Sequence, residues 1–441
     1  MAGRILKYEM DEKLRTLVVG FALAIPILYL YIYALLAQTN KSIFLIGTVL
    51  AILVFFIGAL SLDLEVGSVG LPNFGKVAFF ALGAYISTLL YSVYRWPFYH
   101  IYGIGPIAQF LFSSLVAIII CALVGFLVAI PTVKLRADYF AIMTIAGGEV
   151  IRLILQYEKR WFWAPAPVGP PQQVISNRAI VEFTTGLYPF NKTLAYFGFT
   201  FFEDSNLGSV FLWQIVVIVI FILIAITTYW FVQQIRKSPY GRTLRAIRED
   251  DITVTSVGKD VSRFRWQVTT LAACIAGLAG IMYAMTFKAF EAGDFRPFLT
   301  FDLYIFIIIG GLGNSRGAFA GTALVQMFLR AAQVQEVKEN ISLYLGSESP
   351  VIGPLFEFLQ LDVFINPDNM RLVILGVILI LFLLFMPAGL IPEPKTNNEK
   401  YLKQLTPEER MRSDEAVSAR QSLTERERIG NEDTTEPSSK F

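Results

Sequence analysis

The 441-residue sequence has little charge, one histidine and two cysteines. Charged side chains make up 16% of it, whereas soluble globular proteins carry about 25%. So few charged side chains cannot cover the surface of a large soluble protein, which excludes an ordinary soluble enzyme. The single His100 leaves little room for imidazole chemistry. The cysteines, Cys121 and Cys274, lie in apolar runs and form neither a disulfide framework nor a thiolate metal site.

The charge that is present is concentrated at one end. Residues 393–441 hold 20 of the 72 charged side chains, and we expect a cytoplasmic tail that is mostly disordered. Residues 1–392 are correspondingly apolar. The net charge of +2 provides no basic face, so no nucleic acid partner is expected.

Long apolar runs indicate a multi-pass membrane protein. A spanning helix needs about 20 mostly apolar residues. The candidate runs are 17–36, 43–62, 77–91, 107–130, 138–155, 210–232, 267–285, 301–310, 318–329 and 371–387. The sequence therefore predicts an all-α integral membrane protein of about ten transmembrane helices, with short or re-entrant Gly-rich segments. The transmembrane domain would span 17–392, after a cytoplasmic N-terminus at 1–16.

The basic residues of the loops predict the orientation. The loop 233–266 holds eight basic side chains, so it should be cytoplasmic, whereas 331–370 has six acidic residues and one basic residue and should lie outside. Counting crossings between these loops also puts the long loop 156–209 outside and the tail inside. The assignments agree although each loop was judged by its own charges.

The first candidate site is Gly70-Leu-Pro-Asn-Phe-Gly75-Lys76-Val77, which nearly matches the phosphate-binding loop GxxxxGK[ST]. Val77 stands where that loop needs a hydroxyl for magnesium, and an apolar segment follows. We therefore expect no nucleotide there, and no metal or cofactor elsewhere. Gly67, Gly70 and Gly75 have two other interpretations: non-helical backbone within the membrane protein, or close helix packing.

The second candidate is the basic cytoplasmic segment 238–258. Ser238 and Pro239 are typical of a helix start, and Gly258 is typical of an abrupt end. Leu244 and Ile247 recur at helical spacing beside arginines, which predicts a short amphipathic helix. Such a helix either anchors to the lipid surface or docks into a groove on a cytoplasmic partner.

Two further features lie within apolar runs. Gly310, Gly311 and Gly313 separate two short apolar segments, as in a hairpin that turns inside the membrane or in a plain cytoplasmic turn. Glu149 and Arg152 have the i, i+3 spacing of neighbours on one helix face. They are either a structural ion pair or part of a transport pathway.

Taken together, these segments resemble the M-type membrane permease subunit of branched-chain amino acid ABC transporters. Residues 134–153 (KLRADYFAIMTIAGGEVIRL) resemble the family's LRGDYFAIxTLxxxEIxRL, and 238–258 resembles its SxxGRxLxAIREDExAAxxLG segment. Weaker matches follow in the family's order. They are 67–85 ending in FFALGAY, AGLAGIMY at 276–283, the glycine cluster in 309–323, and FMPAGLI at 385–391.

The resemblance implies a permease subunit of an ATP-driven importer of branched-chain amino acids in the cell membrane, without a catalytic site of its own. ABC ATPase subunits would dock on 238–258. A second permease subunit would complete a heterodimer, and an extracytoplasmic solute-binding protein would deliver the substrate. The implied ATPase-coupling residues are Gly241, Arg242, Arg245, Arg248, Glu249, Asp250, Asp251 and Gly258. The expected substrate pathway comprises Gly67, Gly70, Gly75, Tyr85, Tyr139, Glu149, Gly310, Gly311 and Gly313.

Two departures from the family pattern concern the partner and the substrate. The family's Ala-Ala pair in the coupling segment is Thr253-Val254 here. Where the family often has TGGxxG after the fifth span, this chain has APVGPPQQ at 166–173. Because urea and short-amide transporters use related permeases, such a substrate is an alternative.

An ion-coupled secondary transporter is an alternative of a different class. It would need carboxylates deep in the helix bundle to bind its coupling ion. Asp63, Asp138, Glu149 and Asp302 all fall near the ends of the predicted segments, which disfavours this function.

Overall fold

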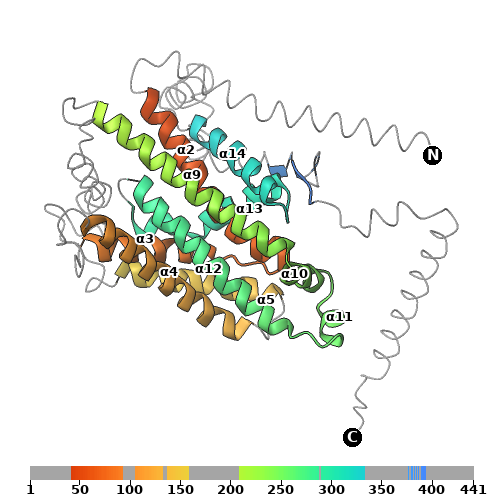
Figure 1. The fold of residues 1–441 in the computed structure, drawn as a ribbon. Helices are drawn as coiled ribbons and strands as arrows, with labels where there is room; N and C mark the ends of the chain where they lie inside the picture. Colours follow the sequence, from red (N-terminus) through yellow and green to blue (C-terminus); the bar gives the residue numbers. More distant parts are fainter. Residues whose placement is uncertain are drawn as a thin grey trace, which may run out of the picture. The chain divides into compact units, whose positions relative to one another are not determined.

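The computed structural model describes residues 41–92, 105–132, 137–157, 208–287 and 290–332, with parts of 376–393. The described chain is helical (Figure 1). Its elements are α2 (Lys41–Val69), α3 (Lys76–Ser92), α4 (Gly105–Thr132), α5 (Ala137–Tyr157), α9 (Gly208–Lys237), α10 (Pro239–Glu249), α11 (Asp251–Ser256), α12 (Val261–Thr286), η1 (Ala292–Phe295), α13 (Pro297–Gly310) and α14 (Ser315–Ala332). The predicted span 17–36, nearly all of the outer loops and the tail lie outside the described residues.

Five described helices, α2, α4, α5, α9 and α12, are long and apolar enough to cross a membrane. The pair α13 and α14 adds a sixth candidate, bent by 117° at its break. The prediction of an all-α integral membrane protein is therefore confirmed. The bend agrees with two short segments separated by a glycine cluster.

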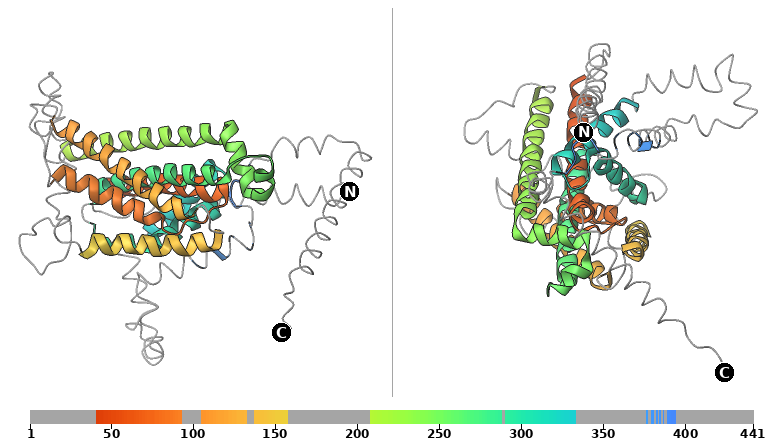
Figure 2. Two further views of the ribbon diagram at one scale, coloured as in Figure 1. Left: turned by 90° about the horizontal axis from the view of Figure 1, so that it is seen from below. Right: turned by 90° about the vertical axis from the view of Figure 1, so that its right-hand side faces the viewer.

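The helices α2 and α12 form the centre of this part of the protein. Within their apolar stretches 89% and 78% of residues are buried, against 22% in each of α4, α5 and α9. Helix α12 packs against α2, α3 and α4 (Figure 2). A side chain at Gly83 would come within 2.1 Å of the Gly277 carbonyl oxygen, so α3 and α12 approach at backbone distance.

The outward faces of α4 and α9 are mostly apolar. Leu115 and Leu123 on α4 and Leu223 and Ile226 on α9 are each more than half exposed. In a membrane protein such faces contact lipid tails, since lipid is as apolar as leucine.

The connection between α2 and α3 is shorter than the sequence predicts. Helix α2 continues to Val69, so Asp63 lies inside the helix and not at the end of a span, which corrects that expectation. Only 70–75 is non-helical. The amides of Gly70 and Leu71 donate to carbonyls of α2, and that of Gly75 donates to Asn73 within the connection, whereas two amides here and at the start of α3 reach other helices. The amide of Phe74 donates to Thr144 of α5, and that of Val77 donates to Thr300 of α13, each over 3.1 Å. Irregular backbone is tolerated in membrane proteins when it is buried and satisfied in this way.

Candidate functional site

The predicted amphipathic helix forms α10, which lies with α11 at one end of the helices (Figure 1). The Ser238 side chain accepts a hydrogen bond from the amide of Gly241, and Pro239 occupies the first turn, as the sequence predicts. Asp250 ends α10 and caps α11 by accepting from the amides of Ile252 and Thr253. These two capping residues let the chain turn twice within 238–258.

Two of the arginines in α10 hold the helix against the rest of the permease. Arg245 donates to the carbonyl of Arg236 over 3.1 Å, and Arg248 donates to the carbonyl of Gly67. Asp251 is tied to α12 by its ion pair with Arg265, at 2.8 Å. Three of the predicted coupling residues therefore fix α10 and α11 to the transmembrane helices.

Other residues of this unit are exposed, and we call them the exposed tip: Arg242, Glu249, Ile252, Val257 and Gly258. Ile252 and Val257 are 75% and 74% exposed. Ile252 had been predicted to continue the apolar spacing of Leu244 and Ile247, but it is exposed, and Val257 had not been singled out. The exposed tip combines charged and apolar side chains.

Burial affects one titratable side chain of α10. The ring of Tyr240 packs 5.2 Å from that of Phe264, and burial raises the pKa of the Tyr240 hydroxyl to about 12. The side chain therefore remains neutral at physiological pH. Tyr240 and Phe264 join the start of α10 to the start of α12.

A buried ion pair lies beside α10. Arg236, in the last turn of α9, donates to Asp63 of α2, with 2.7 Å between Nη2 and Oδ2. The same nitrogen donates to the Asp63 carbonyl, and Nη1 donates to Ser315 Oγ over 2.9 Å. The second Asp63 carboxylate oxygen accepts from the Gly313 amide over 2.8 Å. One ion pair thus joins α2, α9 and the break between α13 and α14.

A second buried pair begins two residues further along α2. Lys76 Nζ lies 2.6 Å from Glu65 Oε2, and both side chains are completely buried. The ammonium also lies 5.8 Å from the centre of the Phe79 ring. This pair spans the short connection 70–75 and fixes the start of α3 against α2.

The two predicted glycine clusters meet near the Asp63–Arg236 pair. A side chain at Gly67 would come within 2.7 Å of the Gly313 amide nitrogen, so Gly67 serves close packing, whereas Gly70 has a φ of 77° in the non-helical connection. Gly311 and Gly313, with φ of 112° and 78°, form the break after α13. Backbone of 389–392 covers this break, where Ile391 donates to the Gly310 carbonyl over 2.9 Å.

The other predicted pathway residues lie apart from this meeting point. Gly75 packs against Thr144 of α5. Tyr85 is buried in an aromatic cluster, 5.3 Å from the ring of Phe290. Tyr139 is 62% exposed on α5.

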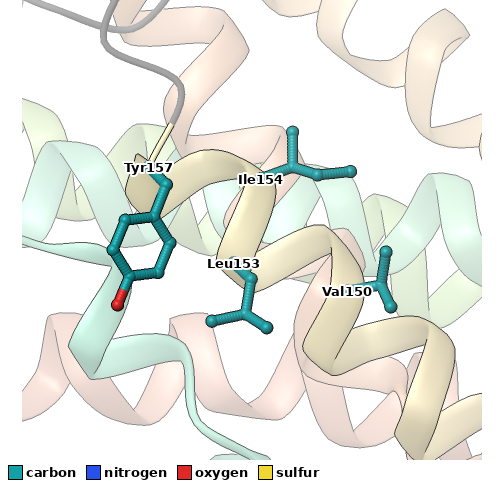
Figure 3. Close-up of a pocket in the computed structure, with 4 residues that line it drawn as sticks. All are labelled: Val150, Leu153, Ile154 and Tyr157. Atoms are coloured by element: carbon teal, nitrogen blue, oxygen red, sulfur yellow. The ribbon is translucent and has the colours of Figure 1, made fainter.

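Helix α5 carries the predicted polar pair on a partly exposed surface. Arg152 Nε donates to Glu149 over 3.0 Å, and Arg152 Nη1 donates to Gln156 over 2.8 Å. A depression beside them is lined only by α5 itself, through Val150, Leu153, Ile154 and Tyr157 (Figure 3). It is an apolar surface feature with no convergent polar groups, so we assign no binding function to it.

Sequence reasoning missed the central members of the two ion pairs. Arg236 counted only as one of the basic loop residues that set the orientation. Glu65 was assigned no role, and Lys76 was considered only as the lysine of the rejected phosphate-binding loop. Ionisable residues at the ends of apolar runs were the available signal. That signal cannot distinguish a side chain that reaches water from one that is paired inside the protein. Among the described residues, no group of His, Cys, Asp or Glu is arranged to hold a metal ion.

Comparison with known proteins identifies the family. The family model "Branched-chain amino acid transport system / permease component" matches residues 43–383. The probable branched-chain amino acid transport permease protein LivM of Methanocaldococcus jannaschii is 28% identical over 361 residues, which cover 77% of this chain and 90% of the relative. The high-affinity LivM permease protein of Escherichia coli is 25% identical over 300 residues, with 67% and 64% covered.

A relative with a different printed substrate also matches. The nucleoside ABC transporter permease protein NupC of Lactococcus lactis is 25% identical over 288 residues, which cover 63% of this chain and 79% of the relative. No solved structure matches this chain. The family match extends from α2 to α14 and includes every residue of the two ion pairs. It confirms the resemblance seen in the sequence. The chain is a multi-pass cell membrane protein that belongs to the family of permease components of branched-chain amino acid transport systems.

Proposed function

We propose that this chain is the permease subunit of an ATP-driven importer of branched-chain amino acids, and that separate ATPase subunits dock on α10 and α11. The observation that carries the proposal is the construction of this unit. Its exposed tip is free for a partner, while Arg245, Arg248 and Asp251 fasten it to the transmembrane helices. A helix that only lay on the lipid surface would not need these attachments.

The proposal places the energy source on another chain. The near match to a phosphate-binding loop at 70–77 is buried: Lys76 pairs with Glu65, and Val77 donates its amide to Thr300. That lysine has no freedom to reach a nucleotide phosphate. In the proposal, docked ATPase subunits hydrolyse the ATP. A second permease and a solute-binding protein complete the transporter.

The ion-coupled alternative has less support. Asp63 and Glu65 are the carboxylates that lie inside α2, and each is already neutralised by a fixed cation. A coupling ion or proton would have to displace that cation. The substrate alternatives, urea or a short amide, keep the same mechanism and differ only in the solute.

Docking is tested by purifying the chain from its own membrane with any ATPase that remains bound. Arg242→Glu and Gly258→Glu place a new negative charge on the exposed tip, so we expect each to reduce the ATPase that co-purifies. Arg263→Glu is the matched control, because Arg263 is exposed at the start of α12 and outside the tip. If a tight ATPase complex survives both tip substitutions, the docking assignment is wrong.

The substrate is tested on the cognate solute-binding protein. Calorimetric titration with leucine, isoleucine, valine, urea and acetamide compares the candidates directly. Binding of the branched-chain amino acids supports the proposal. Binding of urea or acetamide alone would reassign the substrate and leave the transport mechanism in place.

A further inference from the structure

The end of α9 and the start of α10 form one mechanical unit. Only Ser238 separates the two helices, and a side chain at Gly241 would come within 2.5 Å of the Arg236 carbonyl oxygen. Arg245 donates to that same carbonyl. Any displacement of α10 by a docked partner must therefore displace the backbone of Arg236.

The Arg236 side chain carries such a displacement into the helix bundle. Its guanidinium contacts Asp63 of α2 twice and Ser315 at the start of α14 once, with nitrogen–oxygen distances of 2.7 to 2.9 Å. A planar guanidinium holds several partners in fixed directions, which a lysine cannot do. The contact is buried, because Arg236 is 5% and Asp63 is 0% exposed, so water does not compete for these bonds.

Asp63 connects this contact to both breaks in the helices. It receives the amide of Gly313 in the break between α13 and α14, and it lies one helical turn before Gly67. Gly67 touches Gly313, and its carbonyl accepts from Arg248 of α10. The non-helical connection starts three residues later, at Gly70. Two routes from α10, through Arg236 and through Arg248, thus converge on the same pair of breaks.

We propose that the Asp63–Arg236 pair is the joint through which movement of α10 reaches the two glycine breaks, and hence the transport pathway. Both residues act as positioning residues, since they would touch neither ATP nor the solute. This role rests on the proposed function, because it requires an ATPase docked on α10.

The test measures ATP hydrolysed per solute molecule transported, with the complete transporter in proteoliposomes. Asp63→Asn keeps an oxygen for the Gly313 amide and removes the charge. We expect the ratio to rise by roughly five- to tenfold, at the low end of typical coupling between two sites. Arg236→Lys keeps the charge but loses the planar fork that fixes the directions of the three bonds, so its ratio should fall between those of Asp63→Asn and the wild type.

A third variant, Ser315→Ala, still tests the inference if the variants of Asp63 and Arg236 fold poorly. It removes one contact of Arg236 without stranding a charge, and we expect a ratio raised by about twofold with normal abundance. Glu65→Gln is the matched control, because it disrupts the neighbouring buried pair, whose side chains contact Asn73 and Phe79 and no described residue of α10. It should lower the amount of folded transporter and leave the ratio of the remaining transporter unchanged.

The outcomes separate the inference from the proposed function. If an ATPase co-purifies with the wild type, but Ser315→Ala and every folded variant of Asp63 and Arg236 transport at the wild-type ratio, the pair is only structural and the inference is wrong. If the wild type binds no ATPase, the proposed function fails and the joint fails with it. A raised ratio in Glu65→Gln would also contradict the inference, since any damage to α2 would then uncouple transport.

Discussion

Two buried ion pairs begin two residues apart on α2, and they join different parts of the chain. Glu65 pairs with Lys76 across the short connection to α3, so this pair closes a local hairpin. Asp63 pairs with Arg236, which is 173 residues away and adjoins α10. The first pair joins two helices that are neighbours in the chain, whereas the second joins elements far apart in the chain, as transmitted movement requires. The position of these two carboxylates on α2 therefore does not distinguish their roles, whereas the position of their partners in the chain does.

The largest effects should come from removing one member of either pair. Lys76→Met and Arg236→Met each leave an uncompensated buried carboxylate, which typically destabilises a protein by about 3–5 kcal/mol. We expect both variants to show lower abundance and a lower unfolding temperature in detergent. Size-exclusion chromatography after stepwise heating measures this. Wild-type thermal stability in either variant would mean that its carboxylate is not buried as the structure places it.

Replacing both members of a pair should give different results for the two pairs. Glu65→Leu with Lys76→Met removes both charges and, besides them, only the long 3.4 Å hydrogen bond from Asn73 to Glu65, so we expect stability within about 1 kcal/mol of the wild type or above it. Asp63→Leu with Arg236→Met also leaves the Gly313 amide and the Ser315 hydroxyl without their partners. A deficit of about 1–3 kcal/mol should therefore remain. The same heating assay compares the double variants, and equal recovery would contradict the extra contacts of Asp63 and Arg236.

A smaller effect is expected from the packing between the two breaks. In Gly67→Ala the new methyl group would lie 2.2 Å from Asp63 Oδ1 and 2.7 Å from the Gly313 nitrogen. Such overpacking typically costs about 1–3 kcal/mol, and we expect slower transport. Gly147→Ala on α5 is the control, because its methyl group would meet nothing within 4 Å. It should be neutral or stabilising by about 0.5–1 kcal/mol. Equal uptake rates in the two variants would argue against close packing at Gly67.

The smallest effect concerns the cap of α11. Hydrogen bonds from Thr253 hold the pKa of the Asp250 carboxyl below its usual value of 3.8. A lowered pKa means that the cap contributes stability above the unfolded value and loses it as the pH falls through the folded value. We therefore expect no change in cap strength between pH 5 and pH 8. Asp250→Ala should speed hydrogen exchange of the Ile252 and Thr253 amides, while Asp250→Asn keeps them protected.

The regular features of the fold could be predicted from the sequence. Apolar runs identified the spans α4, α5, α9 and α12, and Ser238, Pro239 and Gly258 marked the start of α10 and the turn after α11. These signals are local, since hydrophobicity and capping depend on residues close in the chain. The glycine cluster at 310–313 likewise indicated a break, although not its 117° bend.

The joint itself could not be predicted, because its parts are distant in the sequence. Asp63 looked like a residue at the end of a span, where a charged side chain usually reaches water. It lies inside α2 because Arg236 and the Gly313 amide neutralise and bond it there. Arg236 likewise looked like one basic loop residue among eight. Only the packing of α2, α9 and α14 shows that these two charges meet.

The most direct test of this account compares the two double variants in proteoliposomes, where ATP hydrolysis and solute uptake are measured on the same sample. Glu65→Leu with Lys76→Met should transport at the wild-type ratio of ATP to solute. In the variant Asp63→Leu with Arg236→Met, the number of ATP molecules hydrolysed per solute molecule should rise by roughly five- to tenfold. An unchanged ratio in the second variant, in a transporter that remains folded and ATPase-bound, would contradict the claim that this pair transmits movement from α10.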